Sequence, residues 1–164
     1  MLAGAPTSGL GTVTNAPFYD RAWNQPTAKD WADVLASLPL FAGLTKRQLR
    51  RVAAPARISE YAKGDVVIQA GEKGDAVYVI LSGQARVIGR PRARVLRAGD
   101  YFGEMALIDG QPRSATITAA NDLQTMKLPR QAFLKVLRQD PGIAIAMMAE
   151  MAARIRRVER LSAE

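Results

Sequence analysis

The chain has 164 residues, of which 48% are apolar and 23% are charged, and its net charge is +8. This size and composition predict one globular domain with a hydrophobic core and little room for a second domain. The chain has no cysteine and no histidine, which excludes disulfides and thiolate metal sites and removes the commonest metal ligand and general base. We therefore expect a protein that is not an enzyme and that uses neither a metal nor a cofactor.

Residues 1–25 predict a flexible N-terminal arm, because they are rich in glycine, alanine, proline, threonine and asparagine and show no periodicity. The opening stretch lacks the basic leader and the apolar segment of a secretory signal. No run of eighteen apolar residues occurs, so we expect no membrane span and a cytoplasmic protein.

Two short helices are predicted in residues 26–55. Thr27 can cap the first helix with Asp30 three residues later, and Pro39 ends it. Thr45 can cap the second helix, and Pro55 ends it. The apolar residues expected on the buried faces are Trp31, Val34, Leu35 and Leu38 in the first helix and Leu49 and Val52 in the second.

The hydrophobic period changes to two in residues 56–129, where short β-rich runs alternate with turns that contain glycine. The helical pattern returns in residues 130–161, with Pro129 as a first-turn proline, a break at Asp140-Pro141-Gly142 and a longer helix from about Ile143 to Leu161. The predicted class is α+β: an antiparallel, jelly-roll-like β-roll of about eight strands, flanked by N-terminal helices and two C-terminal helices. A parallel, doubly wound sheet is excluded, because strands and helices do not alternate.

One stretch combines groups that can bind a sugar phosphate. Gly103 permits a tight turn before a short helix whose free N–H groups can bind an anion. Arg113 offers a planar fork of donors for phosphate oxygens, and Glu104 can accept hydrogen bonds from a sugar hydroxyl. The small residues Ala106 and Ala115 allow close approach. From the residues alone, an internal ion pair between Glu104 and Arg113 is as good an interpretation.

This stretch, FGEMALIDGQPRSAT (residues 102–116), resembles the phosphate-binding cassette of the cyclic nucleotide-binding domain family. Members of this family include the catabolite activator protein, the regulatory subunit of cAMP-dependent protein kinase and cyclic nucleotide-gated channels. The resemblance extends to LPLFAGLTKRQLRRVA, to KGDVVIQAGEKGDAVYVILSGQARV with its turn glycines, and to LPRQAFLKVLRQDPGIAIAMMAEMAARI. It implies that residues 26–164 form one cyclic nucleotide-binding domain.

The resemblance implies a role for each residue of the cassette. Arg113 would bind the cyclic phosphate and Glu104 the ribose 2′-hydroxyl. Backbone N–H groups would hold the other phosphate oxygens; they belong to Gly103, Glu104, Met105, Ala106, Ser114 and Ala115. Val87 and Leu96 would form an apolar wall beside the ribose and the base.

The identity of the base is less well specified. By resemblance, Ser114 after the arginine favours cAMP over cGMP, although its hydroxyl leaves cGMP open. The last helix would supply a lid. Val158 stands where the catabolite activator protein has a polar hydroxyl, so it would pack on the purine rather than read its edge. Arg154, Arg156 or Arg157 could stack on the base.

The remaining interpretations concern partners. Ala144, Met148, Met151, Ile155 and Val158 follow a 4-3-4-3 spacing that could form a homodimer or pack on the roll. Two basic runs, residues 46–57 and 86–97, are either solvated faces or surfaces for an anionic partner. The chain ends at residue 164 without an output segment, so we expect a stand-alone or excised sensor that signals to an unknown protein. Nucleic-acid binding is a weaker hypothesis, and a degenerate scaffold without ligand is the main alternative.

Overall fold

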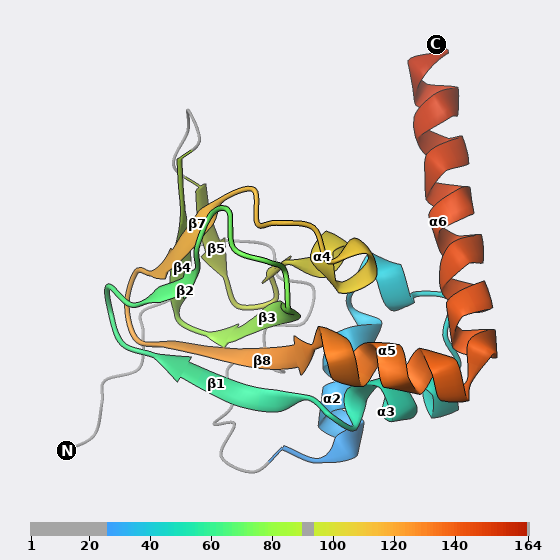
Figure 1. Ribbon diagram of the computed structural model, residues 1–164, viewed down its shortest axis with the longest axis horizontal. Coiled ribbons are helices and arrows are strands. Elements are labelled where there is room, and N and C mark those ends of the chain that lie inside the picture. Colours follow the sequence, from blue (N-terminus) through green and yellow to red (C-terminus); the bar gives the residue numbers. More distant parts are fainter. Residues whose placement is uncertain (1–25, 90–93, 164) are drawn as a thin grey trace.

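A computed structural model describes residues 26–89 and 94–163 (Figure 1). In that part of the chain, eight strands form two four-stranded sheets, with strand orders β1-β8-β3-β6 and β2-β7-β4-β5, in which all neighbours are antiparallel. The strands are β1 (Arg57–Tyr61), β2 (Val66–Ile68), β3 (Ala76–Ser82), β4 (Gln84–Ile88), β5 (Arg94–Arg97), β6 (Tyr101–Phe102), β7 (Thr116–Ala119) and β8 (Leu123–Pro129). The predicted β-roll with flanking helices is confirmed, whereas the predicted arm, residues 1–25, lies outside the described residues.

The lead-in helices begin at the two predicted caps. These helices are α2 (Ala28–Ala36) and α3 (Lys46–Ala53), with a 3-10 turn, η1 (Pro39–Phe41), between them. The Asp30 backbone N–H donates to Thr27 Oγ1 at 3.3 Å, and the Thr27 N–H donates to Asp30 Oδ2 at 2.7 Å. Thr45 and Gln48 form the same reciprocal capping box at the start of α3. Each box satisfies two backbone donors that a helix N-terminus leaves free.

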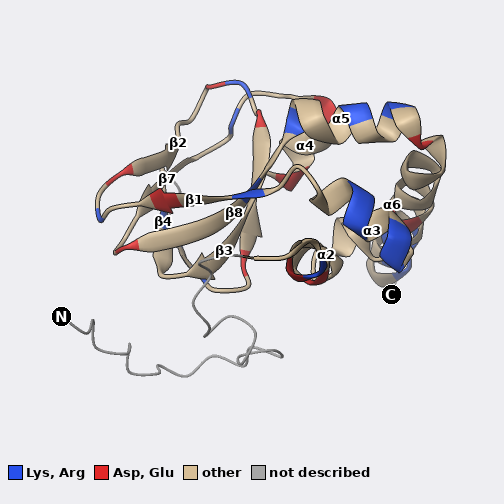
Figure 2. Ribbon diagram, turned by 90° about the horizontal axis from the view of Figure 1, so that it is seen from below, with Lys and Arg blue, Asp and Glu red and all other residues tan. Residues whose placement is uncertain are grey.

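Two hydrophobic cores lie on opposite faces of β3. Val77, Val79 and Leu81 belong to the core that the helices cover, and Tyr78 and Ile80 belong to the core between the two sheets. A strand buried on both faces has a continuous apolar sequence, which the run AVYVIL in β3 shows. Figure 2 shows the resulting arrangement, with the helices gathered at one end of the roll.

The remaining helices are α4 (Glu104–Asp109), α5 (Arg130–Gln139) and α6 (Pro141–Ser162). Pro129 is the last residue of β8 and the N-cap of α5, with ψ 136°, so the prediction of a first-turn proline is wrong by one position. The first-turn proline belongs instead to α6, which begins at Pro141, two residues before the predicted start. Pro141 suits this position because a first-turn N–H has no partner within the helix.

Helix α6 extends away from the rest of the fold (Figure 1). Only Ile143 and Met147 of this helix are buried, and the residues from Ala152 onward are exposed. Among the described residues, no helix is both long enough and apolar enough to cross a membrane.

Candidate functional site

The candidate site begins at the two-residue strand β6, which the sequence pattern did not predict. Tyr101 pairs with Val79 and Phe102 pairs with Tyr78, so β6 adds an edge to the sheet that contains β3. Gly103 follows with φ 84° and is the N-cap of α4. This conformation favours glycine. A strand of two residues shows no period, which is why it could not be found from alternation.

Arg113 is buried, with 7% of its surface exposed. Its NH2 group donates to the Ala76 carbonyl oxygen at 2.8 Å and to Asp75 Oδ1 at 3.3 Å. Its NH1 group is buried and has no hydrogen-bond partner among the described residues. An unpaired buried donor on a cation is costly, so the arrangement suits an anion that would bind NH1.

Glycines allow the backbone to pack closely around this guanidinium. A Cβ atom added at Gly103 would lie 2.5 Å from Arg113 NH1 and 2.8 Å from the Ala76 carbonyl oxygen. A Cβ atom added at Gly74 would lie 2.1 Å from the Ala106 Cβ atom, where real Cβ atoms are not found. Both positions therefore require glycine for the packing that holds α4 and Arg113 together.

The turn between β2 and β3 supports the arginine loop through backbone hydrogen bonds. The Arg113 N–H donates to the Glu72 carbonyl at 2.7 Å, and the Gly71 N–H donates to the Arg113 carbonyl at 2.9 Å. The Gly74 N–H donates to the Gln111 carbonyl at 3.1 Å. These bonds fix the loop on which Arg113 lies, so a turn some forty residues earlier in the sequence determines the position of its side chain.

The ion pair between Glu104 and Arg113, left open by the sequence, is not formed. The ion-pair partner of Arg113 within the described residues is Asp75, whose side chain is 71% exposed. Glu104 is half-buried in the first turn of α4 and faces the same pocket as Arg113. The acid and the base are therefore both available to one ligand.

A pocket of about 450 Å³ lies over α4, the arginine loop and the inner wall of the second sheet. Ligand pockets commonly have volumes of this order. It brings together all nine residues of the predicted pocket, whose role as ligand contacts stays a prediction: Gly103, Glu104, Met105, Ala106, Arg113, Ser114, Ala115, Val87 and Leu96. The pocket also includes residues that the sequence analysis did not select, among them Arg94, Tyr101 and Gln111.

The backbone N–H groups beside the arginine are free to bind an oxyanion. Ser114 and Ala115 lie in a bend before β7, and neither N–H donates to another group in the described part of the chain. At the other side of the pocket, Gly103 has no side chain with which to cap the first turn of α4. The pocket therefore offers backbone donors from two directions around the unpaired Arg113 NH1.

Arg94 extends the predicted apolar wall. It pairs directly with Val87 across β4 and β5 and lies two residues before Leu96, so all three side chains are on one face of the sheet. Arg94 is exposed, and it forms no ion pair with another described residue. The alternation around Leu96 could have identified it, because residues i and i−2 of a strand share a face.

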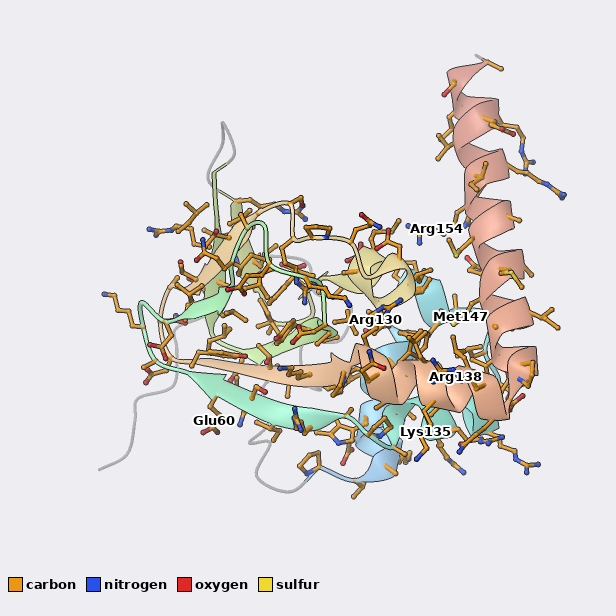
Figure 3. All side chains as sticks on the ribbon, in the orientation of Figure 1. Glu60, Arg130, Lys135, Arg138, Met147 and Arg154 are labelled. Atoms are coloured by element: carbon orange, nitrogen blue, oxygen red, sulfur yellow. The ribbon has the colours of Figure 1, made fainter. Side chains whose placement is uncertain are left out.

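Tyr101 lies at the rim of the pocket among charged groups. Burial raises the pKa of its phenol, and the Glu104 carboxylate raises it further, whereas Arg154 and Arg94 lower it. Arg154 belongs to α6, so its charge reaches this site from the last helix. Figure 3 shows Arg154 on the side of α6 that faces α4.

The three predicted lid residues on α6 do not line the pocket in this structure. Val158 is 62% exposed. Arg157 donates to Glu150 at 3.4 Å, and Arg154 lies on the side of α6 that faces α4 without lining the pocket. A role in covering the base therefore stays a prediction, and it requires α6 to move.

Comparisons with known proteins agree with this geometry. A profile of the cyclic nucleotide-binding domain family matches residues 58–140, about half of the chain. A cGMP-dependent protein kinase of Toxoplasma gondii is 38% identical over 104 residues, which cover 63% of this chain and 10% of the kinase. A cAMP-dependent protein kinase regulatory subunit of Blastocladiella emersonii is 38% identical over 109 residues, covering 63% of this chain and 27% of the subunit. The chain thus spans 27% or less of these relatives' length.

A solved structure matches more completely. The N-terminal domain of a transcriptional regulator from Streptomyces coelicolor A3(2) aligns with a TM-score of 0.69 and 29% identity, over 79% of this chain and 95% of that domain. The fold, the pocket and these similarities together identify the class: the chain belongs to the cyclic nucleotide-binding domain family.

Proposed function

We propose that this domain binds a cyclic mononucleotide in the pocket and signals its binding to a partner protein without catalysing a reaction. The observation on which the proposal rests is the buried Arg113 guanidinium, whose NH1 group has no partner among the described residues. A cyclic phosphate has one negative charge and two free oxygens, which match one guanidinium and the adjacent backbone donors.

In this proposal, Glu104 and Arg113 bind the two ends of one ligand. The Arg113 guanidinium takes the cyclic phosphate together with the N–H groups of Ser114 and Ala115, and the Glu104 carboxylate accepts the ribose 2′-hydroxyl. Both side chains line the pocket and do not pair with each other. Val87 and Leu96 lie on one sheet face beside them, where they would pack on the ribose and the purine.

We infer that cAMP is the preferred nucleotide. Ser114 follows the arginine, and a serine or alanine there is typical of the cAMP-binding members that the sequence resembles. The regulatory subunit of Blastocladiella emersonii, to which the chain is similar, is named for cAMP.

Arg94 supports cGMP as a second candidate. An arginine can donate two hydrogen bonds to the O6 and N7 acceptors of guanine, whereas adenine has an amino donor in place of O6. Arg94 is on the wall where the base would lie, and it has no ion-pair partner in the described part of the chain. The similar kinase of Toxoplasma gondii is named for cGMP.

The output proposed here is a movement of α6 in a cytoplasmic protein. This helix has an exposed apolar stripe that includes Met148, Ile155 and Val158, each about 60% exposed. An exposed apolar stripe of this length favours contact with another surface that covers it. The stripe could close over the bound base, or it could pair with the same helix of a second copy in a homodimer.

Calorimetric titration of the purified chain with cAMP and with cGMP tests the proposal. Saturable binding of either nucleotide, with a smaller dissociation constant for cAMP, is the expected result. An absence of binding by both nucleotides would identify a degenerate fold that acts as a protein scaffold. Retention of duplex DNA with steep salt dependence, without nucleotide binding, would favour nucleic-acid recognition instead.

A further inference from the structure

The helical end of the molecule has a cationic face that the nucleotide pocket does not use. It consists of the exposed cations of two helices: Lys46, Arg47 and Arg50 of α3, and Lys135 and Arg138 of α5. The helices α3 and α5 contact each other, so these groups lie at the same end of the molecule. Figure 2 shows the blue bands on both helices, and Figure 3 shows Lys135 and Arg138 on the outside of α5.

The positive charge of this cationic face is not neutralised within the domain. Neither α3 nor α5 contains an aspartate or a glutamate. None of the five cations forms an ion pair with another described residue. Asp140, which follows α5, is already paired with Arg51 at 3.0 Å. Five cations without counter-charges create a positive potential that attracts an anionic partner.

We propose that the cationic face is a docking surface for an acidic segment of a partner protein. A protein segment fits it better than nucleic acid, because the one aromatic residue of the two helices, Phe133, is fully buried and cannot stack on a base. Helix α3 packs against α2 and α5, so it does not project from the fold as a helix that enters a DNA groove does. A lipid surface fits poorly too, because neither helix exposes a large apolar side chain for insertion.

The ion pair between Arg51 and Asp140 connects the cationic face to α6, the helix that moves in the proposed function. Asp140 is the residue between α5 and α6, and Gln48 of α3 lies against Gly142 at the start of α6. A movement of α6 about this junction would therefore displace α3 relative to α5. The docking surface does not depend on the nucleotide, whereas its use as the output of the pocket rests on the proposed function.

Binding of a fluorescent glutamate-rich peptide to the full chain, followed by anisotropy at low salt, tests the docking surface. A triple variant, Arg47→Gln, Arg50→Gln and Arg138→Gln, removes three charges from the cationic face. The matched control removes three exposed charges elsewhere, with Lys63→Gln, Arg86→Gln and Arg97→Gln. We expect the first variant to weaken peptide binding by about tenfold and the control to change it by less than about threefold.

Three results would overturn the proposal. The first is an equal loss of peptide binding in both triple variants. The second and third are binding of duplex DNA, or of phosphatidylserine vesicles, that is tighter than peptide binding and is lost in the first triple variant. Circular dichroism of each variant excludes misfolding as the cause of a loss. Repeating the titration with saturating cAMP or cGMP tests the coupling separately. A changed peptide affinity supports the output role, and an unchanged affinity in a chain that binds nucleotide contradicts it while leaving the docking surface in place.

Discussion

Arg113 is a cation that the fold buries before any ligand is present. One backbone carbonyl and one exposed carboxylate hold its NH2 group, and NH1 is left without a partner in the described part of the chain. Burying a charge without full pairing costs free energy of folding, which the structure tolerates at sites where a ligand completes the pairing. In the proposed complex, nucleotide binding would relieve this cost.

Tyr78 makes the stability of the roll sensitive to alkaline pH. Burial raises the pKa of its phenol, and the nearby Asp75 carboxylate raises it further. The folded state therefore keeps the proton that the unfolded state loses near pH 10, so its stabilising effect is complete below about pH 10 and is lost as the pH rises through the folded-state pKa. Urea unfolding at about pH 8 and about pH 11 should show a smaller loss of stability in Tyr78→Phe than in the wild type. Equal losses would show that Tyr78 does not determine the alkaline limit.

Arg94 offers a residue-level test of base selection. Arg94→Gln should weaken cGMP binding by roughly tenfold and leave cAMP binding within about threefold, because only guanine presents two acceptors to the guanidinium. Cyclic inosine monophosphate has the O6 and N7 acceptors of cGMP but lacks the guanine amino group. Comparing the binding of the two nucleotides therefore separates the contact of Arg94 from any contact of Ser114 with that amino group. Arg97→Gln is the control, because Arg97 is on the same strand with its side chain on the opposite face. Equal weakening of both nucleotides would mean that Arg94 provides only a general attraction for anions.

At the level of elements, the cassette depends on a turn that is distant in sequence. Gly71 and Glu72 bond to Arg113, and Gly74 bonds to Gln111, so the turn between β2 and β3 holds the arginine loop. The same turn packs against α4 through Gly74. The pocket is therefore one unit of two loops and a short helix, and a defect in the turn would affect the proposed ligand contacts of the loop.

Gly74→Ala tests this dependence. The added methyl group would lie 2.1 Å from the Ala106 Cβ atom and 2.9 Å from the Gln111 carbonyl oxygen. We expect a loss of about 1–3 kcal/mol in the free energy of unfolding and weaker nucleotide binding, since α4 must shift. Gly64→Ala is the control: its Cβ would meet open space, and its positive φ costs about 1 kcal/mol without affecting the pocket. Nucleotide affinity that falls equally in both variants would contradict the account.

The sequence predicted most of the elements because their signals are local. Both helix caps, Thr27 and Thr45, both lead-in helices and the alternation in the roll were confirmed. The two-residue strand β6 and the role of Asp75 beside Arg113 could not be predicted in the same way. A strand of two residues has no period, and a contact between residues 38 positions apart depends on how the two loops meet. The alternation around Leu96 could have identified Arg94 as a pocket residue, but the sequence analysis did not select it.

At the level of the whole molecule, α6 is a long helix with few contacts to its own domain. Its apolar stripe is exposed, whereas its buried residues are confined to the first two turns. An exposed apolar stripe on a helix favours association with another surface. The roll and the lead-in helices contain most of the two buried cores, whereas most of α6 lies outside them.

Ile155→Glu tests whether α6 mediates self-association. If the stripe forms a dimer interface, sedimentation velocity should show a concentration-dependent dimer in the wild type and a monomer in Ile155→Glu, because a charge would be buried without a partner. Ala153→Glu adds the same residue on another face of α6 and should leave the dimer intact. A wild-type monomer at every concentration would restrict the stripe to a role within one chain.

The buried Arg113 guanidinium is the group proposed to bind the cyclic phosphate, and calorimetric titration of Arg113→Ala with the preferred nucleotide tests this role most directly. We expect the dissociation constant to rise by about a hundredfold or more, because a desolvated charge pair is lost. Arg86→Ala, which removes an exposed cation from the outer face of the same roll, should bind as the wild type does. Undiminished binding by Arg113→Ala would contradict the account.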